Sequence, residues 1–164
     1  MTRGIKILAD RGVETEEDIR EFLTADLSKV SDGSELTDME KGVSIIQDAI
    51  AAGKHIRIIG DYDVDGVTST YILYKGLIGL HAKCDKFIPH RIKDGYGLHE
   101  NAIRRAREDG VEVILTCDNG IAAADAVSLA KEFGMTVVVT DHHEVPFVQE
   151  PDGRRYILPA ADAV

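Results

Sequence analysis

The chain has 164 residues, of which 44% are hydrophobic and 29% are charged, and its formal net charge is −10. This length suits one domain with a substantial core, the composition is typical of a soluble globular protein, and the excess of acids disfavours nucleic-acid binding by the chain as a whole. No apolar run is long enough to cross a bilayer, and the start, MTRGIKILADRG, lacks the apolar core of a signal peptide. The two cysteines, Cys84 and Cys117, give no disulfide framework, so we expect a cytoplasmic location without membrane contact.

Taken in chain order, the sequence alternates between helical and strand patterns. Apolar residues at helical spacing, with several runs ending in glycine, predict helices at 15–24, 38–53, 68–80, 98–110 and 122–134. Short β-branched or apolar runs predict strands at 56–60, 83–89, 111–118 and 135–144. This alternation is typical of an α/β fold with a mostly parallel sheet and helices on both faces. We expect a helical lead-in segment over 1–53 and one α/β domain over 54–164.

The stretch DYDVDG at 61–66 begins like an EF-hand calcium loop, but that loop needs a preceding helix and a glutamate at its twelfth position. Here a strand precedes, and the twelfth residue is Ile72. A P-loop is excluded because five residues, not four, separate Gly60 from Gly66 and no lysine follows. The stretch therefore reads as a strand that ends in acids and turns into a helix starting at Gly66. Amide groups at 67–69, including that of Ser69, would then face a phosphate, although a plain helix start is the simpler interpretation of this segment alone.

Acids or histidines follow three of the predicted strands, at 61–65, at Asp118 and at 141–143. One such aspartate is usually a turn former or a helix cap. In a parallel sheet, however, the carboxyl ends of the strands lie at one edge, so these side chains are expected to converge. Carboxylates with one or two imidazoles favour manganese or magnesium, and a bridging carboxylate between two such ions suits hydrolysis of a phosphoester.

Three stretches resemble a known family. DYDVDGVTS, TCDNGI and TDHHE are similar, in order and spacing, to the first three motifs of the DHH phosphoesterases, which are named after an Asp-His-His triplet like that at 141–143. The segment IPHRIKDGYGL (88–98) and the helix leading into DYDVDG resemble the RecJ-type single-strand exonucleases of this family. The resemblance covers the chain from about Gly12 to its end.

The resemblance implies a role for each matched residue. The metal ligands would be Asp63, Asp65, Asp118 and His142, with Asp118 bridging two Mn²⁺ or Mg²⁺ ions in the complete enzyme. His143 would contact the scissile phosphate or the leaving oxygen, and Asp141 would orient an imidazole. Asp61 has no secure counterpart in the wider family, so it is given a supporting role. We expect the planar guanidinium of Arg91 to bind two oxygens of a substrate phosphate. The alternative is that Arg91 is an ordinary surface arginine.

These matches predict a metal-dependent exonuclease that degrades single-stranded DNA from the 5′ end in DNA repair and recombination. Two alternatives stay open: a DHH phosphodiesterase acting on oligonucleotides or cyclic dinucleotides, and a non-catalytic RecJ-like scaffold. The family pattern continues into a fourth motif, whose aspartate completes the second metal site, and into a DNA-binding domain, whereas this chain stops at LPAADAV. We therefore expect a fragment that is weak or inactive alone, and its partners beyond single-stranded DNA, such as a single-strand-binding or repair protein, are not readable from the sequence.

Overall fold

A computed structural model describes residues 3–24, 28, 30–90 and 97–164, and the chain divides into two compact units, Met1–Glu35 and Leu36–Val164. The first unit contains helices α1 (Arg3–Ala9) and α2 (Glu16–Thr24) and a short 3₁₀ helix, η2 (Gly33–Glu35). A reciprocal cap starts α2, because the Asp18 N–H donates to Thr15 Oγ1 at 3.0 Å and the Thr15 N–H donates to Asp18 Oδ2 at 3.3 Å. The acidic helix predicted near 15–24 is thus confirmed, whereas α1 was not predicted.

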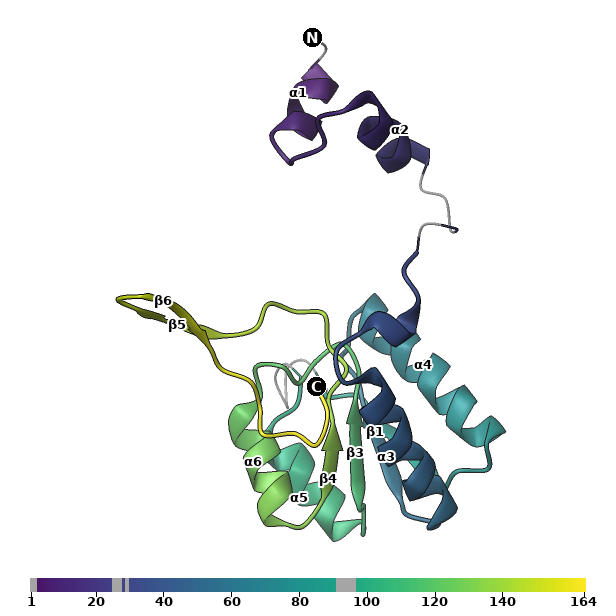
Figure 1. Cartoon of the computed structure of the whole chain (residues 1–164). Helices are drawn as coiled ribbons and strands as arrows, with labels where there is room; N and C mark the ends of the chain where they lie inside the picture. Colours follow the sequence, from purple (N-terminus) through teal and green to yellow (C-terminus); the bar gives the residue numbers. More distant parts are fainter. Residues whose placement is uncertain (1–2, 25–27, 29, 91–96) are drawn as a thin grey trace. The chain divides into compact units, whose positions relative to one another are not determined.

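The second unit is built on a parallel sheet in the order β2-β1-β3-β4 (Figure 1). Its strands are β1 (Ile56–Ile59), β2 (Cys84–Phe87), β3 (Val113–Thr116) and β4 (Thr136–Val138). From β1 the chain first adds β2 on one side and then crosses to add β3 on the other. The strand order therefore reverses between β1 and β3, and the carboxyl ends at such a switch point are where open α/β sheets bind ligands.

Helices cover both faces of this sheet, as predicted. On one face, α3 (Met39–Ala51) and α4 (Val64–Gly79) pack over a core that includes Ile56, Ile58 and Val113. On the other face, α5 (Glu100–Glu108) and α6 (Ala124–Glu132) cover a core that includes Ile59 and Ile114. Successive residues of a strand point to opposite faces, so the β-branched runs fill both cores at once.

The division between the units falls after Glu35, so α3 belongs with the sheet. Its Ala49 is buried in the same core as Ile56, although the division expected at 53/54 assigned this helix to the lead-in segment. The predicted limits of the α/β domain stay a prediction. In the part of the chain that the structure describes, no helix is both long and apolar enough to span a membrane.

The last twenty residues contain elements for which the sequence predicted nothing. An antiparallel hairpin, β5 (Phe147–Glu150) and β6 (Gly153–Tyr156), projects from the second unit (Figure 1). The chain then returns to the sheet, where Ala163 forms a parallel bridge with Val138. The Asp162 carboxylate holds this return in place, because it accepts from the Val137 N–H at 2.8 Å and pairs with Lys131 Nζ.

Candidate metal centre

The turn from β1 into α4 is tighter than the sequence predicted. The helix begins at Val64, two residues before the predicted start at Gly66, because Asp63 caps it: Asp63 Oδ1 accepts from the Gly66 N–H at 3.0 Å. A side chain at Gly66 would put its Cβ 2.5 Å from the Asp61 carbonyl oxygen, so only glycine lets the first helical turn lie against the strand end. Asp61 is 1% exposed beneath this turn, and Asp63 and Asp65 lie on its exposed side.

This early helix start corrects one expectation. The Val67 N–H donates to the Asp63 carbonyl at 3.0 Å, so it lies inside the helix and cannot face a phosphate as a first-turn amide would. The Ser69 hydroxyl donates to the Asp65 carbonyl at 2.7 Å. A phosphate-binding role for Ser69 stays a prediction, and it concerns the hydroxyl alone.

The end of β3 supplies Asp118 in an unusual backbone conformation. Its φ of 60° is left-handed, and its N–H donates to the Thr140 carbonyl at 3.0 Å, which ties the end of β3 to the segment after β4. The next residue, Asn119, is buried and donates from Nδ2 to the carbonyls of Ile59 and Cys117. These bonds lock the ends of β1 and β3 together, so the position of Asp118 is fixed by the sheet.

The segment after β4 brings the Asp-His-His triplet to the same edge. The His142 Nε2 lies 2.8 Å from Asp118 Oδ1, with the histidine side chain 70% exposed and the aspartate side chain 5% exposed. Asp141 Oδ1 accepts from the His143 N–H at 3.1 Å and pairs with His143 Nδ1 at 2.7 Å. Its second oxygen accepts from the Ile121 N–H at 2.9 Å. Asp141 therefore fixes the orientation of the His143 imidazole.

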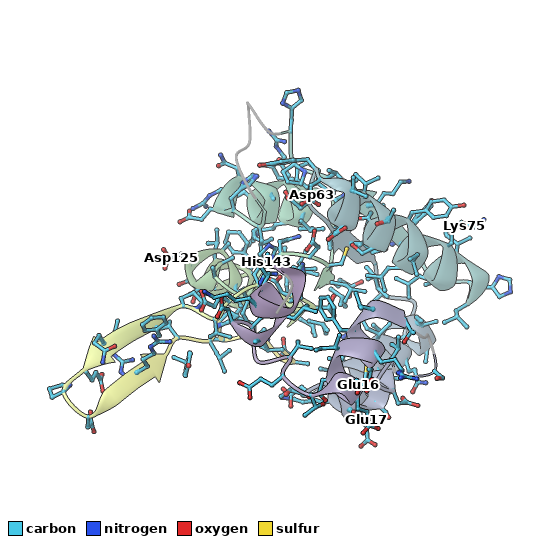
Figure 2. The ribbon with its side chains drawn as sticks, turned by 90° about the horizontal axis from the view of Figure 1, so that it is seen from above. Glu16, Glu17, Asp63, Lys75, Asp125 and His143 are labelled. Atoms are coloured by element: carbon cyan, nitrogen blue, oxygen red, sulfur yellow. The ribbon has the colours of Figure 1, made fainter. Side chains whose placement is uncertain are left out.

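These contacts create a compact group of ligand atoms. One ligand atom from each of Asp118, His142 and His143 lies within 4.8 Å of the others. The Asp63 carboxylate lies near enough to the Asp118 carboxylate to affect its pKa, so acids from two strand ends influence each other. In Figure 2, Asp63 lies at the start of α4 and Lys75 lies at the far part of the same helix. Of the residues expected to converge, Asp118, His142 and His143 lie in one group of ligand atoms, and their roles as ligands stay a prediction.

The pKa shifts reflect this crowding of charge. Burial raises the pKa of Asp118, and the Asp63 carboxylate raises it further, against the opposing effect of His142. The pKa of Asp63 is lowered, chiefly by the Gly66 N–H. The hydrogen bond that the His143 imidazole donates to Asp141 raises the pKa of His143. Burial of Asp141 would raise its pKa, but the hydrogen bonds that it accepts from Ile121 and His143 outweigh burial, so the pKa of Asp141 is lowered. A cation between Asp63 and Asp118 would remove their repulsion.

Two other predicted site residues, Asp65 and Asp61, are described by the structure but are not in this group. Asp65 is exposed in the first turn of α4 and is not among the ligand atoms that cluster within the described residues. Arg91 lies outside the described residues. Asp61 is buried under the turn, and its Oδ1 has no hydrogen-bond partner within the described residues. Asp61 is not among the grouped ligand residues of the described part of the chain.

The profile of the DHH family, N-terminal domain, matches residues 55–163. The chain belongs to this family. Among curated relatives, it is 42% identical over 153 residues to the single-stranded-DNA-specific exonuclease RecJ of Bacillus subtilis, covering 93% of this chain and 19% of that protein. It is 34% identical over 139 residues to the RecJ of Escherichia coli, covering 84% of this chain and 23% of that protein. The chain thus spans about a fifth of the length of these relatives.

Two solved structures also resemble the chain. One is exonuclease RecJ bound to manganese, with a TM-score of 0.67, 33% identity, and coverage of 79% of this chain and 31% of the other. The second is RecJ of Thermus thermophilus in complex with Mn²⁺, with a TM-score of 0.60, 30% identity, and coverage of 79% and 17%. The α/β fold with a mostly parallel sheet is thereby that of the DHH family and of RecJ.

The ligand atoms of Asp118, His142 and His143 are of the types that bind a divalent cation. Asp118 Oδ2 is buried and has no hydrogen-bond partner in the described part of the protein, so a strong acceptor is left unsatisfied at the centre of the group. Carboxylate oxygens and imidazole nitrogens together suit manganese, magnesium or zinc, and no described cysteine thiol is in the ligand group to favour a softer metal.

A cavity of about 280 Å³ adjoins the DHH triplet. Its lining is mostly apolar and comes from three segments, with residues Gly97, Leu98, Asn119–Ala123, Asp141 and His143. Sequence reasoning missed both this cavity and the role of Asn119, whose Oδ1 is buried without a partner among the described residues. Asn119 stands in the quoted TCDNGI stretch, and an asparagine directly behind a strand-end aspartate was the available signal.

Proposed function

We propose that this chain forms the metal-binding part of a manganese- or magnesium-dependent exonuclease that hydrolyses the phosphodiesters of single-stranded DNA from its 5′ end. The observation that carries the proposal is the meeting of Asp118, His142 and His143 at the carboxyl ends of the strands, with Asp63 near enough to affect the pKa of Asp118. The likeness to RecJ proteins, named as single-stranded-DNA-specific exonucleases, supports the substrate, and the manganese-bound RecJ structure supports the metal. The direction of degradation rests on the motif resemblance.

In this proposal, Asp63, Asp65, Asp118 and His142 hold the metal, and Asp118 bridges two ions. Bound ions would supply positive charge at the scissile phosphate and acidify water for attack on it. Asp118 is fixed by the sheet through the Thr140 carbonyl, so the central ligand needs little rearrangement. Asp65 lies in the first turn of α4, on a helix start that Asp63 already caps.

His143 is proposed to contact the scissile phosphate or the leaving oxygen. Asp141 pairs with its Nδ1, which holds the imidazole plane and its tautomer. The cavity beside His143 is proposed to receive the terminal nucleotide, since it adjoins the ligands and its lining is mostly apolar. Arg91 and the Ser69 hydroxyl remain proposed phosphate contacts.

The test uses a protein of the relatives' length that contains this chain, which we call the RecJ-length form. We expect it to release nucleotides from 5′-labelled single-stranded DNA when Mn²⁺ is added, and to do so faster than the 164-residue chain alone. Asp118→Ala should abolish hydrolysis, whereas Asp48→Ala, an exposed acid on α3, should leave it unchanged.

Three outcomes would contradict the proposal. Faster cleavage of a cyclic or linear dinucleotide than of single-stranded DNA would favour the oligonucleotide phosphodiesterase. Absence of hydrolysis with any divalent metal would favour the scaffold. Substantial manganese-dependent activity in Asp118→Ala would remove the bridging ligand from the account.

A further inference from the structure

The hairpin β5–β6 exposes aromatic and cationic side chains that no part of the catalytic proposal uses. Tyr156 is 57% exposed and Phe147 is 37% exposed, and every residue of β6 is exposed. None of the hairpin residues belongs to either core of the second unit. An isolated two-stranded hairpin contributes little stability by itself, so its exposed aromatic residues are poorly explained by folding alone.

The two faces of the hairpin differ in charge. Phe147 lies opposite Tyr156 and Gln149 opposite Arg154, so these four side chains share one face. On this face the rings of Phe147 and Tyr156 meet edge to face at 6.1 Å, and the Arg154 guanidinium lies 4.3 Å from the Phe147 ring centroid.

The acids of the hairpin lie off that face. Glu150 lies on the other face and pairs with Arg155 at 2.6 Å, and Asp152 lies in the turn. We call the side with Phe147, Gln149, Arg154 and Tyr156 the aromatic face. It carries one cation and no acid, in a chain whose net charge is −10.

The hairpin is also directly continuous with the candidate metal centre. Phe147 follows His143 by four residues, a path of about 13 Å if the segment is extended. Figure 1 shows the hairpin reaching away from the sheet and its helices. A single strand of DNA with one end at His143 could therefore reach the aromatic face with its fourth nucleotide or so, if its bases are spaced as in a stack.

We propose that the aromatic face is an arm that binds the single-stranded substrate outside the metal centre. Phe147 and Tyr156 stack on bases, and Arg154 contacts a phosphate. Stacking of bases on aromatic side chains beside a cation is how proteins hold single strands without reading their sequence, and each stacked base contributes about 5- to 150-fold in affinity. This inference rests on the proposed function, because it assigns a further contact to the same substrate.

The experiment measures binding of a trinucleotide and of a 12-nucleotide single strand to the RecJ-length form without Mn²⁺, by fluorescence anisotropy. The trinucleotide is too short to reach the arm. We expect Phe147→Ala and Tyr156→Ala each to lower the preference for the longer strand by about 5-fold or more. The matched control is Tyr71→Ala, which removes a 62% exposed tyrosine from α4 and should leave the preference unchanged.

A second pair of variants tests the phosphate contact. Arg154→Gln should make the salt dependence of binding less steep, by about 0.7 in the slope of log affinity against log salt. Arg155→Gln removes the neighbouring arginine, which pairs with Glu150 on the other face, and should leave that slope unchanged.

Failure of the arm and failure of the proposed function are separable. If the RecJ-length form hydrolyses single-stranded DNA but Phe147→Ala and Tyr156→Ala keep the full preference for the longer strand, the aromatic face does not bind the substrate, and the proposed exonuclease function is unaffected. If these variants instead change only the oligomeric state in solution, the aromatic face binds protein and the arm is again wrong. If the unmodified form neither binds nor hydrolyses single-stranded DNA, both proposals are overturned.

Discussion

Replacing Gly66 with alanine should destabilise the protein and displace the metal centre together. A Cβ at this position would lie 2.5 Å from the carbonyl oxygen of Asp61 and 2.6 Å from its carbonyl carbon and its nitrogen. All three atoms belong to the backbone, so no side-chain rotation can relieve the contact. The turn must open, and Asp63, whose cap depends on the Gly66 N–H, must move with it.

The size of the effect follows from two opposing terms. Forcing a methyl group into a closely packed position costs roughly 1–3 kcal/mol, and rigid backbone neighbours favour the upper end. Alanine gains about 1 kcal/mol over glycine within a helix, so we expect a net loss of roughly 2 kcal/mol. With a urea dependence of about 2 kcal/mol per molar, the unfolding midpoint should fall by about 1 M.

Gly76→Ala is the matched control on the same helix. Apart from its chain neighbours and the backbone of its own helix, no atom of the described residues lies within 4 Å of a Cβ at Gly76, so this variant should gain stability, raising the midpoint by up to about 0.5 M. Urea unfolding followed by circular dichroism measures both variants. A Gly66→Ala protein that is as stable as Gly76→Ala would refute the close-packed turn.

Two further predictions concern carboxylates whose partners are visible. Both oxygens of Asp85 accept from Arg57, at 2.7 Å each, and although burial of Asp85 opposes it, this pairing lowers the Asp85 pKa. The ion pair of Asp85 with Arg57 therefore stabilises the fold fully above the pKa of an unfolded aspartate, about 3.9, and this stability is lost as the pH falls through the lower pKa of Asp85 in the folded protein. In Asp85→Asn this loss is absent, so the urea midpoint should fall less steeply below pH 4 than in the unmodified protein. Asp141→Asn should slow hydrolysis of single-stranded DNA by the RecJ-length form by about 10- to 100-fold, because it disturbs the partner that holds the His143 imidazole; an unchanged rate would remove Asp141 from the support of the site.

The sheet could be predicted because three of its four strands, IRII, VILT and TVV, are rich in β-branched residues, and β2 is a short run between two helical patterns. The start of α4 could not, since a glycine in DYDVDG suggested a helix start at Gly66, whereas the Asp63 cap begins the helix at Val64. The hairpin was missed because FVQE and GRRY are short and mostly polar, although a Pro-Asp-Gly turn signal separates them.

The convergence of acids and histidines could be predicted from topology alone, because parallel strands deliver their carboxyl ends to one edge. Contacts that depend on side-chain rotamers could not. The pairing of Asp141 with His143 was expected only from family resemblance, and the cap that Asp63 forms depends on the tight turn at Gly66. The unsatisfied Asn119 oxygen likewise depends on which carbonyls its amide group reaches.

Binding of Mn²⁺ to the RecJ-length form tests the metal centre most directly, since it needs no substrate. Asp118→Asn keeps the size of the side chain and removes the charge of the central ligand. We predict that it weakens Mn²⁺ binding, measured by calorimetry, by at least about 10- to 100-fold. That is the loss expected when only a hydrogen-bond partner of a metal ligand is changed, and here the ligand itself is changed. Asp48→Asn, an exposed acid on α3, should bind as the unmodified protein does. Equal Mn²⁺ affinity in Asp118→Asn and the unmodified protein would contradict the account.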